Sequence, residues 1–194
     1  GEKIFDYVDP RNRGRQIEME QACTEHLKAI GGYLEPKFQE IAFDKGEFEY
    51  EASVMIPVRN RIRTVRDAIK SVLAQKCNFK FNLIIVDNGS TDGTTEAIQE
   101  FKDDERLIHI IPERNDLGIG GCWNLGAHHP KCGKFIVQLD SDDVYKDENT
   151  LQTMVNAFYE QNCAMVVGTY MMTDFNMNMI APGIIDHKEW TPEN

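Results

Sequence analysis

The residues with the clearest chemical potential in this sequence are the three aspartates of the run Asp140–Asp143. In an extended segment, residues i and i+2 point to the same side, so Asp140 and Asp142 can face one centre. Such carboxylates suit Mg²⁺ or Mn²⁺, which bind through one or two of them plus substrate phosphate oxygens. The alternative is a turn or helix cap, which the same residue types favour. An EF-hand is excluded, because Val144 and Tyr145 stand where its third ligand and glycine belong.

Two further polar runs follow apolar segments, Arg59–Arg61 after the first and Asp87–Ser90 after the second. Asp87 can accept a hydrogen bond from a nucleobase N–H, with Asn88 assisting. The same residues are also well suited to a tight turn that binds nothing.

A third polar run, Glu113–Asp116, precedes the glycine cluster Leu117–Gly121. That cluster resembles a phosphate-binding loop, but it does not follow the first strand, as a dinucleotide fingerprint requires. Its glycines can instead allow close packing or the approach of backbone to a ligand.

The histidines near these runs indicate no catalytic role. His128 and His129 precede Pro130 and are expected at a solvated helix end, whereas His109 lies in an apolar run and is expected in the core or at a sheet edge.

Apolar runs alternate with helical patterns from about residue 52 onward. The runs are nearly continuous, as in a parallel sheet covered on both faces, and they predict strands near residues 52–58, 81–86, 106–111, 134–139 and 163–168. Apolar residues at helical spacing predict helices near 65–73, 95–101 and 151–158, the first with Thr64 and Asp67 as a capping box. The fold class is therefore α/β, a mostly parallel open sheet with helices on both faces. Because ligands bind at the carboxyl ends of such strands, the polar runs outline one site.

Residues 1–51 differ in pattern and are predicted to be a partly helical N-terminal extension of the domain at 52–194. A helix is expected over about 16–30, packed beside the sheet. The arginines of Arg11–Arg15 can contact a ligand or lipid phosphate, or form a solvated turn, the more common state of a charge run.

Composition excludes several functional classes. The formal net charge of −11 argues against nucleic acid and against adhesion to an anionic membrane. An acidic protein that binds a phosphorylated ligand usually needs a cation or backbone amides to do so. The five cysteines are too scattered for a disulfide framework or a zinc site. With no apolar run of about 20 residues and no secretory signal, a cytoplasmic location is expected, with peripheral attachment to the inner membrane face as a further option.

Four of these segments together resemble the large inverting glycosyltransferase family two. Ser53–Asn60 is similar to its opening strand, and Ile84–Thr94 resembles its second strand and turn nearly residue for residue. Asn115–Gly126 looks like the start of its asparagine- and glycine-bearing helix, and Phe135–Asp143 looks like its DxD strand. The match runs from about residue 52 to 170 in the family's order and spacing.

The resemblance implies a GT-A fold whose first half binds a nucleotide-diphosphate sugar. Carried over by position, Asp87 would pair with the base, Asp140 would lie near the ribose, and Asp142 would hold the metal, with Asp143 as a lesser candidate. With the residues singled out above, the expected nucleotide-binding set is Pro57, Val58, Asn60, Asp87, Asn88, Asn115, Gly118 and Asp140. The expected metal set is Asp142, Asp140 and Asp143, for Mg²⁺ or Mn²⁺.

The sequence departs from the family pattern in two places. Trp123 stands before Asn124 where many members have an arginine, which puts a side-chain phosphate contact there in doubt. The family's acidic pair and aromatic–arginine motif are not recognisable after Val144. Of the later carboxylates Asp174, Asp186 and Glu189, none sits in that context. The catalytic base is unassigned and expected beyond residue 194, with the domain incomplete at its C-terminus.

The predicted function is the transfer of a sugar, with inversion and metal assistance, from a nucleotide-diphosphate sugar to a hydroxyl acceptor. A hexosyl group, a UDP-sugar donor and a carbohydrate or lipid-linked acceptor are expected, in polysaccharide or glycoconjugate synthesis. The alternative is a non-catalytic nucleotide-sugar-binding or scaffold protein. A sugar nucleotidyltransferase is disfavoured, because Pro57–Asn60 replaces the glycine-rich loop that such enzymes carry after the first strand.

Overall fold

The computed structural model describes residues 10–37, 39–114 and 116–187, in a chain that divides into two units. The first unit, Gly1–Glu40, contains a short 3-10 helix, η2 (Pro10–Asn12), and helix α1 (Arg13–Ala29). The predicted helix over 16–30 is therefore present with an earlier start. The packing predicted for this segment stays a prediction. No helix among the described residues is both long and apolar enough to cross a membrane.

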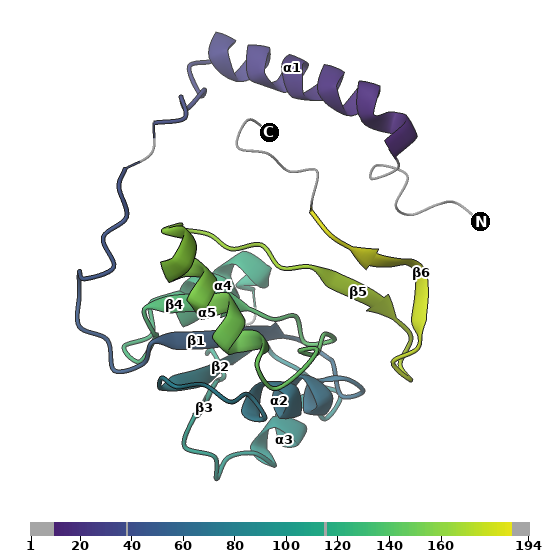
Figure 1. The fold of residues 1–194 in the computed structure, drawn as a ribbon. Coiled ribbons are helices and arrows are strands. Elements are labelled where there is room, and N and C mark those ends of the chain that lie inside the picture. Colours follow the sequence, from purple (N-terminus) through teal and green to yellow (C-terminus); the bar gives the residue numbers. More distant parts are fainter. Residues whose placement is uncertain (1–9, 38, 115, 188–194) are drawn as a thin grey trace. The chain divides into compact units, whose positions relative to one another are not determined.

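The second unit, Ile41–Asn194, contains a four-stranded parallel sheet in the order β3-β2-β1-β4 and an antiparallel pair, β5 and β6 (Figure 1). Its elements are β1 (Ala52–Val58), α2 (Val65–Leu73), β2 (Phe81–Asp87), α3 (Thr94–Gln99), β3 (Leu107–Ile110), α4 (Gly118–Ala127), β4 (Phe135–Gln138), α5 (Thr150–Gln161), β5 (Tyr170–Thr173) and β6 (Met179–Ile185). The predicted α/β class with a mostly parallel sheet is confirmed.

Strand β1 forms the centre of the sheet, paired with β2 along one edge and with β4 along the other. Ala52, Val54, Met55 and Ile56 are all fully buried, and only Pro57 among its residues is half-buried. A strand covered on both faces carries apolar side chains at successive positions, which explains the continuous apolar run in the sequence.

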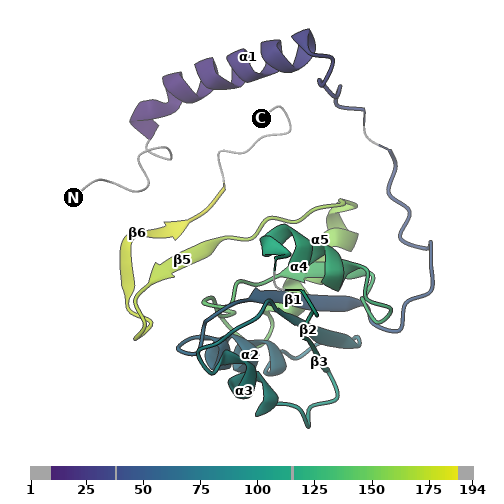
Figure 2. The same cartoon turned by 180° about the vertical axis from the view of Figure 1, so that it is seen from behind.

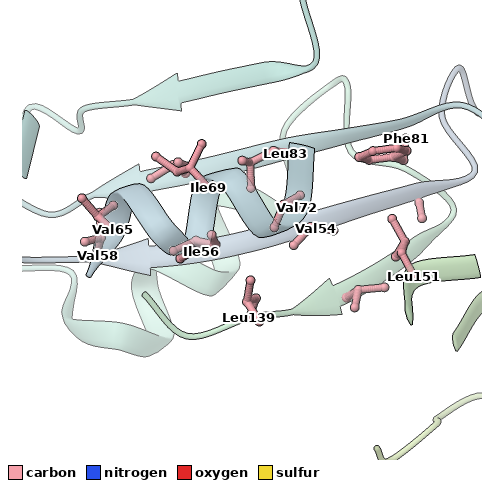
Figure 3. Packing of buried hydrophobic residues seen from close by; sticks show 14 of the residues in the cluster. Val54, Ile56, Val58, Val65, Ile69, Val72, Phe81, Leu83, Leu139 and Leu151 are labelled. Atoms are coloured by element: carbon pink, nitrogen blue, oxygen red, sulfur yellow. The ribbon is translucent and has the colours of Figure 1, made fainter. Parts of the chain in front are cut away.

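Helices cover both faces of the sheet. On one face, α2 buries Val65, Ile69 and Val72 against the core residues of β1 and β2 (Figure 3), and α5 packs on the same cluster. On the other face, α4 contributes Cys122 to a smaller cluster with Ile84 and Val86 of β2. Figure 1 accordingly has α5 in front of the sheet, and the reversed view in Figure 2 has α4 in front.

One predicted strand is wrong. Residues 163–168 form no strand, and the first strand after α5 is β5. Two exposed side chains, Met165 at 74% and Val167 at 46%, lie in this run. An apolar run forms a strand only where a neighbouring strand can take its backbone hydrogen bonds, and β5 finds that partner in β6.

The predicted capping box at the start of α2 is also wrong. The Thr64 hydroxyl is buried and has no hydrogen-bond partner among the described residues. The backbone carbonyl of Thr64 instead accepts hydrogen bonds from the N–H groups of Asp67 and Ala68. Burial against the sheet, rather than capping, therefore stabilises this end of the helix.

Gly133 provides a test of how closely the chain packs against β1. It is buried just before β4, and a Cβ atom there would lie 2.7 Å from the carbonyl carbon of Ala52. We expect Gly133→Ala to lower the free energy of unfolding by about 1–3 kcal/mol, because backbone cannot move aside as a flexible side chain can. Urea unfolding would measure this change in the free energy of unfolding. The control is Gly120→Ala in α4, where a Cβ meets nothing within 4 Å and stability should stay equal or rise. Equal effects of the two changes would contradict the packing described.

Candidate functional site

A pocket of about 490 Å³ lies where the carboxyl ends of the strands meet. The sheet order reverses at β1, since β2 and β3 lie on one side of it and β4 on the other. Open α/β sheets bind ligands at such a switch point. The pocket is lined by Pro57, Val58, Arg59, Arg61, Asn88, Gly118, Ile119, Cys122, Asp140, Ser141 and Asp142.

Most of the residues predicted from the sequence meet at this pocket. The predicted residues that line it are Pro57, Val58, Asn88, Gly118, Asp140 and Asp142. Asn60, Asp87 and Asp143 are not among the lining residues, and Asn115 lies outside the described residues. The ligand roles of all of them stay predictions.

Asn60 holds the loop beside the pocket. Its backbone is in the left-handed region at φ 55°, which asparagine tolerates better than most residues. Its N–H donates to the Ser90 hydroxyl at 3.0 Å, and its side-chain oxygen accepts from the N–H of Thr91 at 2.8 Å. These bonds fasten the loop after β1 to the loop after β2.

Two more hydrogen bonds extend this connection. The N–H of Arg61 donates to the hydroxyl of buried Thr94 at 2.7 Å, and the N–H of Ile62 donates to the Asp92 carboxylate at 3.1 Å. The Thr94 hydroxyl donates in turn to Asp92, a bond that lowers the pKa of that carboxyl. The residues after β1 therefore have a fixed backbone.

Asp87 ends β2 and is fully buried. One carboxylate oxygen accepts the N–H of Ser90 at 3.1 Å, and the other accepts the Thr95 hydroxyl. His109 Nε2 lies 3.7 Å from the second oxygen, and His109 Nδ1 lies 2.7 Å from the Gln99 amide nitrogen. Asp87 thus binds protein groups and is fully buried, so the base contact predicted for it would require the surrounding residues to move.

These contacts control the ionisation of Asp87. Burial raises the pKa of the carboxyl, but the His109 ring 3.7 Å away and the hydrogen bonds from Ser90 and Thr95 outweigh burial and lower the pKa to about 2. Asp87 is therefore ionised at neutral pH. The expectation that His109 is a core or edge residue is confirmed, since its side chain is 7% exposed on the edge strand β3.

Asn88, the next residue, lines the pocket and has fewer hydrogen-bond partners than Asp87. It is 6% exposed and lines the pocket, and its side-chain oxygen has no hydrogen-bond partner among the described residues. Its backbone N–H is bound to the carbonyl of Val58 at 2.9 Å, which fixes its position. A buried acceptor without a partner is costly. The oxygen itself is inaccessible to water, so a ligand N–H in the pocket would satisfy it after a small turn of the side chain.

The acidic run after β4 forms a turn rather than the extended segment we expected. The N–H of Asp143 donates to the carbonyl of Asp140 at 3.1 Å. The turn still brings both Asp140 and Asp142 to the pocket, with exposed carboxylates. The turn and the ligand interpretations of this run are therefore compatible.

Charge is unevenly distributed around this turn. Arg61 Nε lies 3.8 Å from a carboxylate oxygen of Asp142. Partial loss of hydration, with the nearby Asp140 and Asp142 carboxylates, raises the pKa of Asp143. A cation bound at the turn would relieve this repulsion.

The residues present fit a divalent cation that takes part of its coordination from the phosphate oxygens of a bound ligand. No three histidine, cysteine, aspartate or glutamate side chains within the described ranges are grouped as a metal site. Asp140 and Asp142 supply two exposed hard oxygen donors to one pocket, and Mg²⁺ typically takes one or two carboxylates plus phosphate oxygens. Asp142 and Asp140 are thus the residues that would hold Mg²⁺ or Mn²⁺.

Helix α4 begins at the pocket wall. Gly118 is in the left-handed region at φ 59°, and it lines the pocket with Ile119 and Cys122. The first N–H groups of a helix have no partner within the helix and favour an anion. The predicted approach of glycine backbone to a ligand is compatible with this geometry. His128 ends the helix in solvent, as we predicted.

Sequence reasoning left five lining residues unassigned. They are Arg59, Arg61, Ile119, Cys122 and Ser141. The arginines were visible as the polar run after the first strand, and Ser141 lies inside the acidic run. Ile119 and Cys122 are three positions apart on one helix face, which only the docking of α4 directs to the pocket.

Comparison with known proteins shows what this chain is similar to. The model of the family described as Glycosyl transferase family 2 matches residues 53–188. An uncharacterised glycosyltransferase of Rickettsia felis is 41% identical over 113 residues, which cover 58% of this chain and 18% of that protein. A putative teichuronic acid biosynthesis glycosyltransferase, TuaG of Bacillus subtilis, is 29% identical over 120 residues, which cover 62% of this chain and 46% of that protein.

Solved structures with a similar fold include two glycosyltransferases. TarS 1-349 of S. aureus in complex with UDP-GlcNAc has a TM-score of 0.50 at 25% identity, covering 58% of this chain and 32% of that one. The mannosyltransferase PcManGT of Pyrobaculum calidifontis, in complex with GDP-Man and Mn²⁺, has a TM-score of 0.50 at 18% identity, covering 79% and 42%. The chain spans less than half the length of each of these relatives.

The buried carboxylate of Asp87 predicts a pH-dependent stability. A fall in pKa from 3.8 to about 2 stabilises the folded state by about 2 kcal/mol at neutral pH. Because the folded pKa is depressed, this contribution is present above about pH 4 and is lost as the pH falls toward 2. We expect Asp87→Asn to lower the free energy of unfolding at pH 7, by a margin that narrows below about pH 4.

Urea unfolding at several pH values measures this margin. Asp103→Asn is the matched control, because Asp103 is exposed and should show no pH-dependent difference from the unchanged protein. A margin for Asp87→Asn that is constant between pH 7 and 3 would contradict the role given to the buried charge.

Proposed function

This chain belongs to glycosyltransferase family 2, and we propose that its pocket binds the nucleoside diphosphate of a nucleotide-sugar donor. The observation that carries the proposal is the convergence on one pocket of Asn88, with its unpartnered oxygen, and the acidic pair Asp140 and Asp142. An acceptor for a base and two ligands for a cation are what a nucleoside diphosphate requires.

The size and the walls of the pocket support this ligand. Its volume of about 490 Å³ lies in the usual range for small-molecule sites. Pro57 and Val58 form an apolar surface at the end of β1 against which a base can pack, and the first turn of α4 offers backbone N–H groups to a phosphate. A UDP-sugar is the proposed donor, in line with the UDP-GlcNAc bound by TarS.

Asp142, with Asp140, would hold Mg²⁺ or Mn²⁺ on the diphosphate. When bound, such a cation neutralises charge on the departing nucleoside diphosphate. In this proposal Asp142 would have the larger role in holding the cation, and Asp140 would also lie near the ribose. Asp143, which does not line the pocket, would act through its charge alone.

The proposed reaction is transfer with inversion. An acceptor hydroxyl loses its proton to a base and forms a bond to the anomeric carbon as the bond to the nucleotide breaks. Among the described residues we assign no base. Asp174 is engaged in its own turn, where its carboxylate accepts the N–H groups of Asn176 at 2.8 Å and Asn178 at 2.9 Å.

The proposed acceptor is a carbohydrate or lipid-linked hydroxyl in the synthesis of an envelope polysaccharide or glycoconjugate. The similarity to TuaG, a putative teichuronic acid biosynthesis enzyme, supports that setting. Transfer of a hexosyl group is part of the same proposal, in line with the UDP-GlcNAc bound by TarS.

Calorimetric titration with UDP, GDP and CDP, each with and without Mn²⁺, tests the donor site. We expect one of the three to bind in a metal-dependent way, and Asp142→Asn to weaken that binding about tenfold or more through loss of a charged ligand. Asp103→Asn is the control, since that carboxylate precedes β3, at the opposite edge of the sheet. Absence of binding by any nucleotide, with Mn²⁺ present, would contradict the proposal. Nucleotide binding without sugar transfer would favour the non-catalytic alternative.

Asn88 gives a second, sharper test of the same site. If its side-chain oxygen accepts an N–H of the base, Asn88→Ala should weaken UDP binding by roughly fivefold to tenfold. Binding of inorganic pyrophosphate with Mn²⁺ should be unchanged, because pyrophosphate has no base. Equal loss for both ligands would show that the substitution disturbs the loop and does not remove a base contact.

A further inference from the structure

Arg61 lies opposite the acidic turn, on the other wall of the pocket. Its Nε atom is 3.8 Å from the carboxylate of Asp142, and a terminal nitrogen donates to the carbonyl of Asn60 at 3.3 Å. Both partners of the ion pair remain about half exposed, at 50% and 53%. An exposed pair of this kind adds little to stability. The ion pair therefore affects the charge of the pocket more than the stability of the fold.

The backbone that carries Arg61 is fixed. The backbone N–H of Arg61 donates to the hydroxyl of buried Thr94, and the N–H of the next residue, Ile62, donates to the Asp92 carboxylate. These two bonds hold the backbone on either side of the Arg61 Cα atom. The long side chain therefore projects from an anchored position into the pocket. A cationic group held in this way loses less freedom when it binds a ligand than one on a loose loop.

The charges that line the pocket balance without a ligand. Arg59 and Arg61 carry two positive charges, and Asp140 and Asp142 carry two negative charges. A diphosphate is strongly anionic, and the whole chain has a net charge of −11. The lining charges favour that ligand when a cation joins them or when the carboxylates release an arginine, in addition to the N–H groups at the start of α4.

We propose that Arg61 binds the diphosphate of the donor, and that Asp142 holds Arg61 in place until a divalent cation takes that carboxylate. The inference rests on the proposed function and adds to it a residue that alternates between two partners. A cation bound by the Asp142 carboxylate would repel the Arg61 guanidinium, whose Nε lies 3.8 Å from that carboxylate, and would so weaken the ion pair. Asp142 therefore releases Arg61 as it accepts the cation, and the guanidinium turns to the phosphate oxygens, which it can bind through two N–H groups.

This exchange couples the two ligands. Release of Arg61 by Asp142 makes the pocket more attractive to a diphosphate, and a diphosphate that binds Arg61 leaves Asp142 open to a cation. By linkage each ligand raises the affinity for the other by the same factor. Arg61 opposes the cation when the pocket is otherwise empty and supports the nucleotide once the cation is bound.

Arg61→Gln separates these two effects. For Mn²⁺ alone, followed by titration calorimetry and by the electron paramagnetic resonance signal of free Mn²⁺, the variant should bind roughly twofold to fivefold more tightly, as expected for loss of an exposed ion pair. For UDP at saturating Mn²⁺, the variant should bind about tenfold more weakly, as expected for loss of a charged hydrogen bond. Opposite changes for the two ligands cannot come from a general disturbance of the loop.

Arg63→Gln is the matched control. Arg63 lies two positions away in the same loop, is exposed and stacks on the Phe175 ring at 4.5 Å, and is not among the residues that line the pocket. Both affinities should match those of the unchanged protein. Arg61→Lys keeps the charge and should recover part of the UDP affinity. Equal thermal unfolding midpoints establish that the variants are folded.

Two outcomes would overturn the inference. If Arg61→Gln leaves the Mn²⁺ affinity unchanged or lowers it, Arg61 does not compete for Asp142. The same conclusion follows if neither protein binds Mn²⁺ measurably. UDP binding that the variant leaves unchanged would mean that Arg61 is no phosphate ligand. The failure of the proposed function is different, since the unchanged protein would then bind no nucleoside diphosphate even with Mn²⁺.

Discussion

The structure depends on the position of β1 at the centre of a parallel sheet. Its backbone is hydrogen-bonded to β2 on one edge and to β4 on the other, and its side chains are buried on both faces. Parallel strands have their carboxyl ends at the same end of the sheet. This pairing therefore brings together Val58, Asp87 and the turn after β4, which are far apart in the chain. The reversal of strand order at β1 opens the space between them.

Several short polar residues beside the pocket serve the loops rather than a ligand. Asn60, Asp92 and Thr94 fasten the loop after β1 to the loop after β2, and Asp87 holds the second loop with a buried, ionised carboxylate. These bonds satisfy backbone groups that leave the sheet without a strand partner. They also give the pocket-lining residues Asn88 and Arg61 fixed positions, which a binding site requires.

The electrostatics of the pocket follow from the acidic character of the chain. Two arginines and two aspartates line it, in a protein with a net charge of −11. Such a site cannot attract a diphosphate by a general positive field and must rely on a cation, on helix N–H groups and on single arginines. The chain belongs to glycosyltransferase family 2, and it spans less than half the length of TuaG and of TarS 1-349. The donor, the acceptor and the metal are therefore proposals.

The sequence by itself determined the α/β class, the parallel sheet and the end of the sheet at which the pocket lies. Continuous apolar runs, helical spacing at Val65–Leu73 and polar residues after each strand are local patterns, and burial on two faces allows few other interpretations. The sequence could not determine which polar residue of a run enters the pocket. Asp87 and Asn88 are neighbours, yet Asp87 is fully buried among protein partners, whereas Asn88 lines the pocket and has a buried side-chain oxygen without a partner. Likewise Arg61 and Asp142 are 81 positions apart, and only the pairing of β1 with β4 brings them within 3.8 Å. Such contacts depend on the direction of each side chain after its strand ends, and tertiary hydrogen bonds set that direction rather than local sequence.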